Sequence, residues 1–197
     1  MEILLFGKYK TADVAVKDDA LRPYINIAPR LLLKSHGKHI GKFAATKTHL
    51  VERLANRIAV PGHVGKKHKV ITSWASGKYN RNMKTVMETL DMIELKKKEN
   101  PVQILVKAVE NASPRDETTT IEYGGARYPQ AVDVSPTRRI NLALRWMVQG
   151  AYQKAFGKKT KMAESLAREI ILASEGNMES YAMSKKNDAE KQADSAR

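Results

Sequence analysis

The sequence contains no cysteine, and it has no uninterrupted run of 18 apolar residues. The first absence excludes disulfide bonds and zinc sites with cysteine ligands. The second excludes a membrane-spanning helix. The apolar run within the opening residues MEILLFGKYK is too short for a secretory signal, and no basic leader precedes it.

Acidic residues are also in short supply, with 21 against 35 basic ones, which gives a net charge of +14. The imbalance is concentrated. Residues 1–28 are neutral, whereas residues 29–69 contain ten basic side chains and one acidic side chain, Glu52, for a net +9. Such a block predicts a polyanionic partner, and RNA, DNA and an anionic membrane surface all fit the composition alone.

No arrangement of side chains typical of catalysis or metal binding is present. The candidate carboxylates are predicted to lie on the surface, and none pairs with a histidine in a motif: Glu52, Asp133, Glu164 and Glu169. All five histidines lie within the basic block, where lysines would repel a cation. No serine has the context of a nucleophile elbow. We therefore expect neither an enzyme nor a cofactor or metal site.

A β-hairpin is predicted at about residues 118–134. Two β-branched and aromatic runs, Thr118–Tyr123 and Tyr128–Val134, flank a segment that opens with Gly124 and Gly125. Both strands are too polar to pack a core. Two interpretations remain open: a ribbon that projects from the body and is steadied by a partner, or an edge hairpin that lies on its own domain.

Apolar residues at helical spacing predict the rest of the body. Helices are expected at residues 48–60, 80–95, 101 to near Pro114, 136–155 and 160–174, and residues 178–197 form either a docked helix or a frayed tail. The predicted fold is mainly α: a bundle of about six helices with one projecting β-hairpin and a basic, irregular N-terminal arm. Residues 1–47 form the extension and arm, and residues 48–197 form the helical domain.

The first 47 residues divide in two. Residues 1–28 are neutral, and we expect a short strand or extended segment that packs on protein. Residues 29–47 carry lysines interrupted by glycines, which predicts an irregular arm that becomes ordered on RNA. Further on, the basic loop at residues 62–69 contains glycines that allow its backbone to approach phosphate.

Several motifs together resemble the universal small-subunit ribosomal protein seven family. They are Tyr123-Gly124-Gly125-Ala126-Arg127-Tyr128, Val132-Asp133-Val134-Ser135-Pro136, Leu142-Ala143-Leu144-Arg145-Trp146, Val106–Pro114 with Asn100-Pro101, and Met162–Ala167 with Glu169-Ile170. The similarity covers roughly residues 48–197. The N-terminal extension and the tail Ser180–Lys186 resemble the archaeal and eukaryotic branch rather than the bacterial one.

This resemblance implies a structural protein of the cytoplasmic ribosome, without a membrane partner. Its implied partners are small-subunit rRNA in the 3′ major domain, where it would nucleate head assembly, exit-site tRNA and mRNA near the hairpin, and neighbouring head and platform proteins. The expected hairpin residues near tRNA and mRNA are Tyr123, Gly124, Gly125, Arg127 and Tyr128. Charge and resemblance together give the expected rRNA-binding residues Lys34, Lys38, Lys42, Lys47, Arg53, Arg57, Lys66, Lys67, Lys69, Lys78, Arg81, Arg138 and Arg139.

Two other classes compete with this interpretation. A DNA-binding regulator would concentrate its charge on one recognition helix, but here glycines break the basic block. An RNA-modifying enzyme would need a catalytic constellation, and the sequence shows none.

Overall fold

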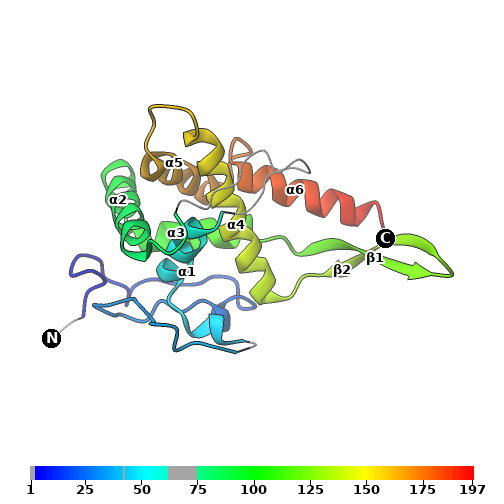
Figure 1. The fold of residues 1–197 in the computed structure, drawn as a ribbon, viewed down its shortest axis with the longest axis horizontal. Coiled ribbons are helices and arrows are strands. Elements are labelled where there is room, and N and C mark those ends of the chain that lie inside the picture. The colour runs from blue at the N-terminus through cyan, green and yellow to red at the C-terminus, as the bar shows by residue number, and fades with distance from the viewer. Residues whose placement is uncertain (1–2, 42, 62–74) are drawn as a thin grey trace.

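The structure is a computed structural model that describes residues 3–41, 43–61 and 75–197. Within this part of the chain, six α-helices and one two-stranded antiparallel sheet are present, which confirms the predicted fold class (Figure 1). The elements are α1 (Leu50–Ala59), α2 (Tyr79–Lys97), α3 (Pro101–Ala112), β1 (Asp116–Tyr123), β2 (Ala126–Asp133), α4 (Pro136–Ala155), α5 (Met162–Ser174) and α6 (Tyr181–Asp194).

Helix α5 lies at the centre of the body and packs against α2, α3 and α4. Its small and aliphatic side chains allow this, since Leu166, Ala167 and Ile170 are completely buried. The predicted apolar faces of the other helices point into the same core, for example Leu54 of α1 and Leu90 of α2, both fully buried. Burial of these aliphatic side chains is the main source of stability.

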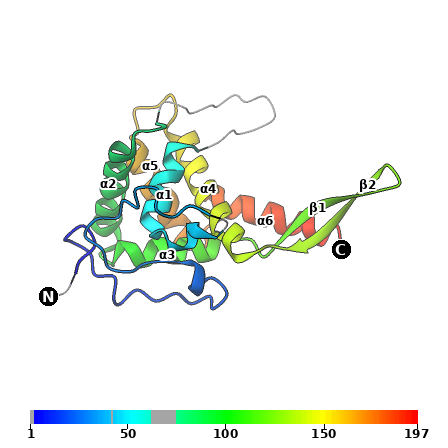
Figure 2. The ribbon, with the colours of Figure 1, turned by 60° about the horizontal axis from the view of Figure 1, so that its bottom comes forward.

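The neutral N-terminal segment packs on the body, as predicted. It has no regular strand, but its apolar side chains at positions 5, 9, 14, 16, 21 and 25 all belong to the core. Figure 2 shows this segment running along the edge of the body beneath α3. Gln103 of α3 holds it like a strand partner, accepting from the Ala15 N–H at 2.9 Å and donating to the Ala15 carbonyl at 3.0 Å.

The basic arm at residues 29–47 is irregular, as predicted, apart from one 3₁₀ turn at Ala44–Lys47. Its start is anchored by Leu33, which is buried, and by Ser35, whose N–H and hydroxyl both donate to Glu52 of α1. Its end leads to His49, whose side chain caps α1 by accepting from the Val51 N–H. Ordering of the arm by RNA stays a prediction.

The β-ribbon projects away from the helices in both views (Figures 1 and 2). Its strands are longer than predicted, because Ala126 and Arg127 pair with Tyr123 and Glu122 and leave only Gly124 and Gly125 in the turn. Both glycines have positive φ, +59° and +82°, as a two-residue type I′ turn requires. Along the strands, only residues next to the body are half-buried.

The C-terminal residues form a docked helix rather than a frayed tail. Helix α6 packs against α4 and against β1 at the root of the ribbon. Glu169 of α5 organises its start, since this carboxylate accepts from the Ser180 hydroxyl at 2.7 Å and the Ala182 N–H at 3.1 Å. The ribbon is therefore steadied at its root by the protein's own last helix, while its far end is free of the body.

Candidate nucleic-acid interface

A basic groove of about 770 Å³ lies between the N-terminal arm, α1 and α4. Helical spacing sets its walls: Arg53, Asn56 and Arg57 share one face of α1, and Asn141 and Arg145 lie one turn apart on α4. The arm adds Lys34, His36 and His39. The sequence therefore folds three predicted RNA-binding residues, Lys34, Arg53 and Arg57, into a single site.

The guanidinium groups of Arg57 and Arg145 both line this groove, and neither forms an ion pair with a carboxylate of the described residues. Burial, followed by the nearby charge of Arg145, lowers the pKa of Arg57. Arg57 donates only a long hydrogen bond of 3.5 Å to the Pro61 carbonyl, and its Nε has no partner among the described residues. Two like charges in this setting favour a bound anion, such as a phosphate group.

Of the groove's lining residues that the structure describes, Glu52 is the one with a carboxylate. The expectation that Glu52 and Glu169 lie on the surface was wrong: their residues are 3% and 0% exposed. Glu52 is buried because it accepts two hydrogen bonds from Ser35, and Glu169 because it pairs with Lys154 at 2.7 Å and caps α6. Glu52 is thus directed toward the protein and leaves the groove positively charged.

Arg53 lies at the floor of the groove and is tied to the protein. It donates to the Tyr24 carbonyl and to Asn141 Oδ1, both at 3.0 Å, and only 8% of the residue is exposed. Burial lowers its pKa to about 10, so the group is still charged at neutral pH. It contributes positive potential and joins the N-terminal segment, α1 and α4 to one another.

The other predicted rRNA-binding residues that the structure describes lie outside the groove. Lys38 and Lys47 are exposed on the arm, and Lys78 and Arg81 are exposed at the start of α2. Arg138 pairs with Glu117 of β1 at 2.6 Å. Four further predicted residues, together with the basic loop at 62–69, lie outside the described residues: Lys42, Lys66, Lys67 and Lys69.

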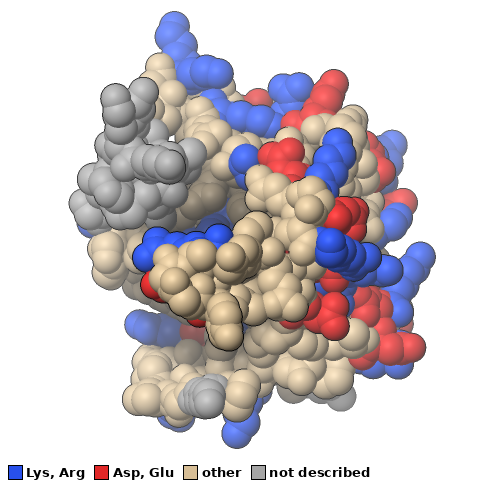
Figure 3. All heavy atoms as spheres, turned by 90° about the vertical axis from the view of Figure 1, so that its right-hand side faces the viewer, with Lys and Arg blue, Asp and Glu red and all other residues tan. Residues whose placement is uncertain are grey.

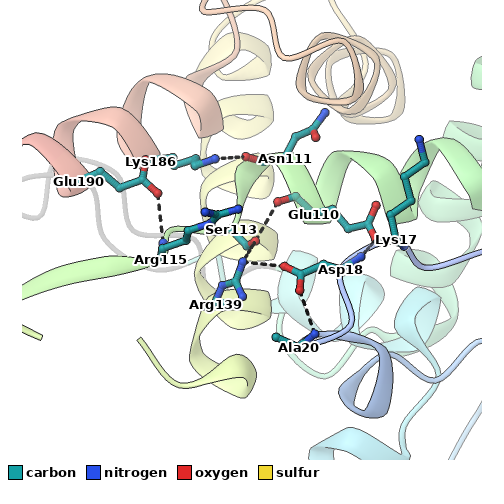
Figure 4. A network of polar contacts seen from close by, with 10 residues as sticks. All are labelled: Lys17, Asp18, Ala20, Glu110, Asn111, Ser113, Arg115, Arg139, Lys186 and Glu190. Atoms are coloured by element: carbon teal, nitrogen blue, oxygen red, sulfur yellow. Dashed lines mark hydrogen bonds and ion pairs between the residues drawn. The ribbon is translucent and has the colours of Figure 1, made fainter. Parts of the chain in front are cut away.

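Arg139 is buried at the root of the ribbon, where it joins three segments (Figure 4). Its Nη2 donates to Asp18 Oδ2 at 2.9 Å and to the Ser113 hydroxyl at 3.2 Å. Glu110 of α3 accepts from the N–H groups of Lys17 and Asp18, which fixes the N-terminal segment here. The structure thus gives Arg139 internal partners.

The network continues into the ribbon and α6. Glu190 accepts from the Arg115 N–H at 3.1 Å, and Lys186 donates to the Asn111 carbonyl at 2.9 Å (Figure 4). The Arg115 carbonyl accepts from the Val134 N–H at 2.8 Å, which closes the base of the hairpin. The direction in which the ribbon projects is therefore set by α3, α4, α6 and the N-terminal segment together.

The far end of the ribbon presents exposed aromatic side chains. Tyr123 is 81% exposed and Tyr128 is 58% exposed. Arg127 faces Glu122 across the ribbon at 3.6 Å, so the two charges offset each other. In Figure 3 the projecting ribbon points toward the viewer with mainly uncharged side chains. Its chemistry therefore differs from that of the groove.

Sequence reasoning missed Arg145, Asn56, Asn141 and the two groove histidines as parts of one site. Helical spacing gave part of the signal, because Asn141 and Arg145 are four residues apart and must share a face. What the sequence did not provide was the orientation of that face toward α1 and the arm.

Among the described residues, no helix is long and apolar enough to cross a membrane, and no cluster of three or more metal-ligating side chains occurs.

Comparison with known proteins gives consistent matches. The profile of the family described as ribosomal protein S7p/S5e matches residues 25–197. The chain belongs to the ribosomal protein S7p/S5e family. It is 48% identical over 198 residues to small ribosomal subunit protein uS7 of Nanoarchaeum equitans, covering both chains completely. It is also 44% identical to uS7 of Methanococcus maripaludis over the whole of both chains, and to uS7 of Methanothermobacter thermautotrophicus over 98% of each.

Membership of the S7p/S5e family confirms the resemblance and its archaeal type. The chain is a structural protein of the small subunit of the cytoplasmic ribosome and not an enzyme. The similarity to archaeal uS7 proteins extends through the N-terminal segment, because these alignments span the full chain. The two competing classes, a DNA-binding regulator and an RNA-modifying enzyme, are thereby set aside.

Proposed function

We propose that this S7p/S5e protein binds the 3′ major domain of small-subunit rRNA through the groove between the arm, α1 and α4, and thereby nucleates assembly of the subunit head. The observation that carries the proposal is the Arg57–Arg145 pair, two guanidinium groups that line the same groove without a carboxylate partner among the described residues. Lys34 and the exposed lysines Lys38 and Lys47 extend the positive surface along the arm.

The ribbon serves a second contact. We assign its end to exit-site tRNA and the mRNA path, and the remaining surface to neighbouring head and platform proteins. Tyr123 and Tyr128 support this because exposed aromatic rings suit stacking on nucleotides. The exposed strands of the ribbon do not form a hydrophobic core, and the helical body already has one.

Binding of purified protein to a 3′-domain rRNA transcript tests the groove. If about six phosphates are neutralised, log affinity should fall with log salt at a slope of about −4 to −5. The double variant Arg57→Glu, Arg145→Glu should bind at least about tenfold more weakly and show a flatter slope.

The matched control is Lys107→Glu, Lys191→Glu, which changes the net charge equally at exposed positions of α3 and α6. It should keep most of the affinity. An affinity that does not depend on salt, or equal losses in both double variants, would overturn the assignment of the groove.

A further inference from the structure

A second cavity, of about 760 Å³, lies at the end of α1, between the start of α2, the end of α4 and the start of α5. Its volume is within the range of small-ligand sites, about 300–1,000 Å³. The groove and this cavity meet at α1, where Arg57 lines the first and Ile58 lines the second. One bound RNA can therefore reach both.

Two aromatic rings from the end of α4 line the cavity. The ring centroids of Tyr152 and Phe156 are 5.6 Å apart at an interplanar angle of 33°. Phe156 is 61% exposed, although a large apolar side chain at a helix end normally packs inward. With Ile58 and Met162 beside them, these rings form an apolar platform suited to a flat ring.

Cations surround this platform. Lys84 of α2 and Lys161, just before α5, line the cavity and form no ion pair within the described part of the chain. Arg81 adds a third positive charge, and Glu88 is the one acidic residue among the described lining residues. Thr160 supplies a hydroxyl group that can donate and accept, and the Thr85 hydroxyl, which donates to the Arg81 carbonyl at 3.1 Å, can still accept. An apolar platform bordered by lysines matches a group that is flat at one end and anionic at the other.

We propose that this cavity holds one unpaired nucleotide of the bound rRNA. Its base lies against Phe156 and Tyr152, and its phosphate lies beside Lys84 and Lys161. The proposal rests on the proposed rRNA binding but concerns a different surface and a different chemistry. The groove favours backbone phosphates of any sequence, whereas an apolar cavity with aromatic walls requires a base that has left its stack.

Chemical probing of base reactivity tests the cavity directly, using full-length protein on the 3′-domain rRNA transcript. The wild-type protein should protect at least one unpaired base that Phe156→Ala leaves reactive. Affinity should fall between about fivefold and a hundredfold, as when a base loses its stacking partner. Ala155→Trp, which fills the cavity, should expose the same base while leaving Phe156 in place.

Leu95→Ala is the matched control, because Leu95 is also a large exposed apolar side chain, at 78%, but lies outside the cavity. It should leave every base as protected as wild type does. Identical protection by wild type and Phe156→Ala would overturn the nucleotide site while leaving rRNA binding in the groove intact. A Phe156→Ala protein that protects all bases but fails to enter small subunits would assign the cavity to a protein partner and also overturn the proposal. A wild-type protein that does not bind the transcript would overturn both.

Discussion

The helical body and the β-ribbon are held in shape by different means. In α4, Ile140, Ala143 and Met147 are fully buried, so burial of apolar surface fixes the helix. In the ribbon, all residues from 118 to 130 are exposed, and hydrogen bonds between the two strands set its shape. The ribbon takes its direction from the polar network at its root. The body therefore provides most of the stability of the fold, and the exposed residues of the ribbon are available for contacts with a partner.

The largest expected effect comes from placing a charge in the body. Leu144→Asp would bury an unpaired carboxylate at a position that is 2% exposed, at a cost of about 4 kcal/mol or more. Denaturant unfolding should show loss of the folded state or a strongly reduced midpoint. Leu95→Asp, at an exposed position of α2, should change stability by less than about 0.5 kcal/mol. Similar losses of stability in both variants would contradict the assignment of Leu144 to the hydrophobic core.

A pH effect should also be confined to the body, because the ribbon has no histidine. Burial, followed by the charge of Arg30, lowers the pKa of His49 from 6.5 to about 4. Since the unfolded chain takes up a proton below pH 6.5 and the folded protein does not, stability should fall between pH 6.5 and about 4. The loss amounts to at most about 3 kcal/mol.

His49→Asn keeps a capping side chain for α1 and removes the titrating group. Its stability curve should be flatter than that of wild type over this pH range. His36→Asn, at an exposed position, should follow the wild-type curve. Parallel curves for wild type and His49→Asn would show that His49 does not cause the loss.

A smaller effect is expected where body and ribbon meet. Asp18→Ala removes the partner of Arg139, whose side chain is 10% exposed, and should cost about 2 kcal/mol. The Val134 N–H at the ribbon root should then exchange faster with solvent. The control is Asp19→Ala, since Asp19 is 86% exposed and pairs with Arg22 at the surface. Unchanged hydrogen exchange at Val134 in the Asp18→Ala variant would show that the polar network around Arg139 does not stabilise the root of the ribbon.

The smallest effect on stability should come from the end of the ribbon. Replacing Tyr123–Tyr128 by a short glycine linker removes only exposed residues and should shift unfolding by less than about 0.5 kcal/mol. Binding to the rRNA transcript should persist, whereas retention of exit-site tRNA or reading-frame fidelity should decline. A shortened protein that cannot enter small subunits, or that supports normal translation there, would contradict the separation of the two regions.

Sequence periodicity was sufficient for the helices and the hairpin, because both depend on spacing along the chain. It was insufficient for charged residues whose partners are distant. Arg139 was predicted as an RNA contact, but Asp18, 121 residues away, pairs with it. Glu169 was predicted at the surface, but Lys154 and the first turn of α6 surround it. No local pattern reports such a partner.

Close packing was equally invisible in the sequence. Gly150 lies inside α4 without a positive φ, yet a Cβ built there would lie 2.6 Å from Tyr181 Cβ. The glycine allows α6 to approach the backbone of α4. The same limit applies to the groove. The sequence shows that Arg57 and Arg145 are charged, but their proximity depends on how α1 and α4 pack.

The attachment of the N-terminal segment has a consequence for the order in which the chain acquires its structure. Asp18 depends on Glu110 for its backbone and on Arg139 for its side chain. Translation at roughly 5–20 residues per second leaves the segment waiting on the order of 6–24 s for Arg139 to be made. Contacts of such long range also form slowly. The part of the chain that is synthesised first is therefore among the last to be fixed, and during that interval its apolar side chains need protection.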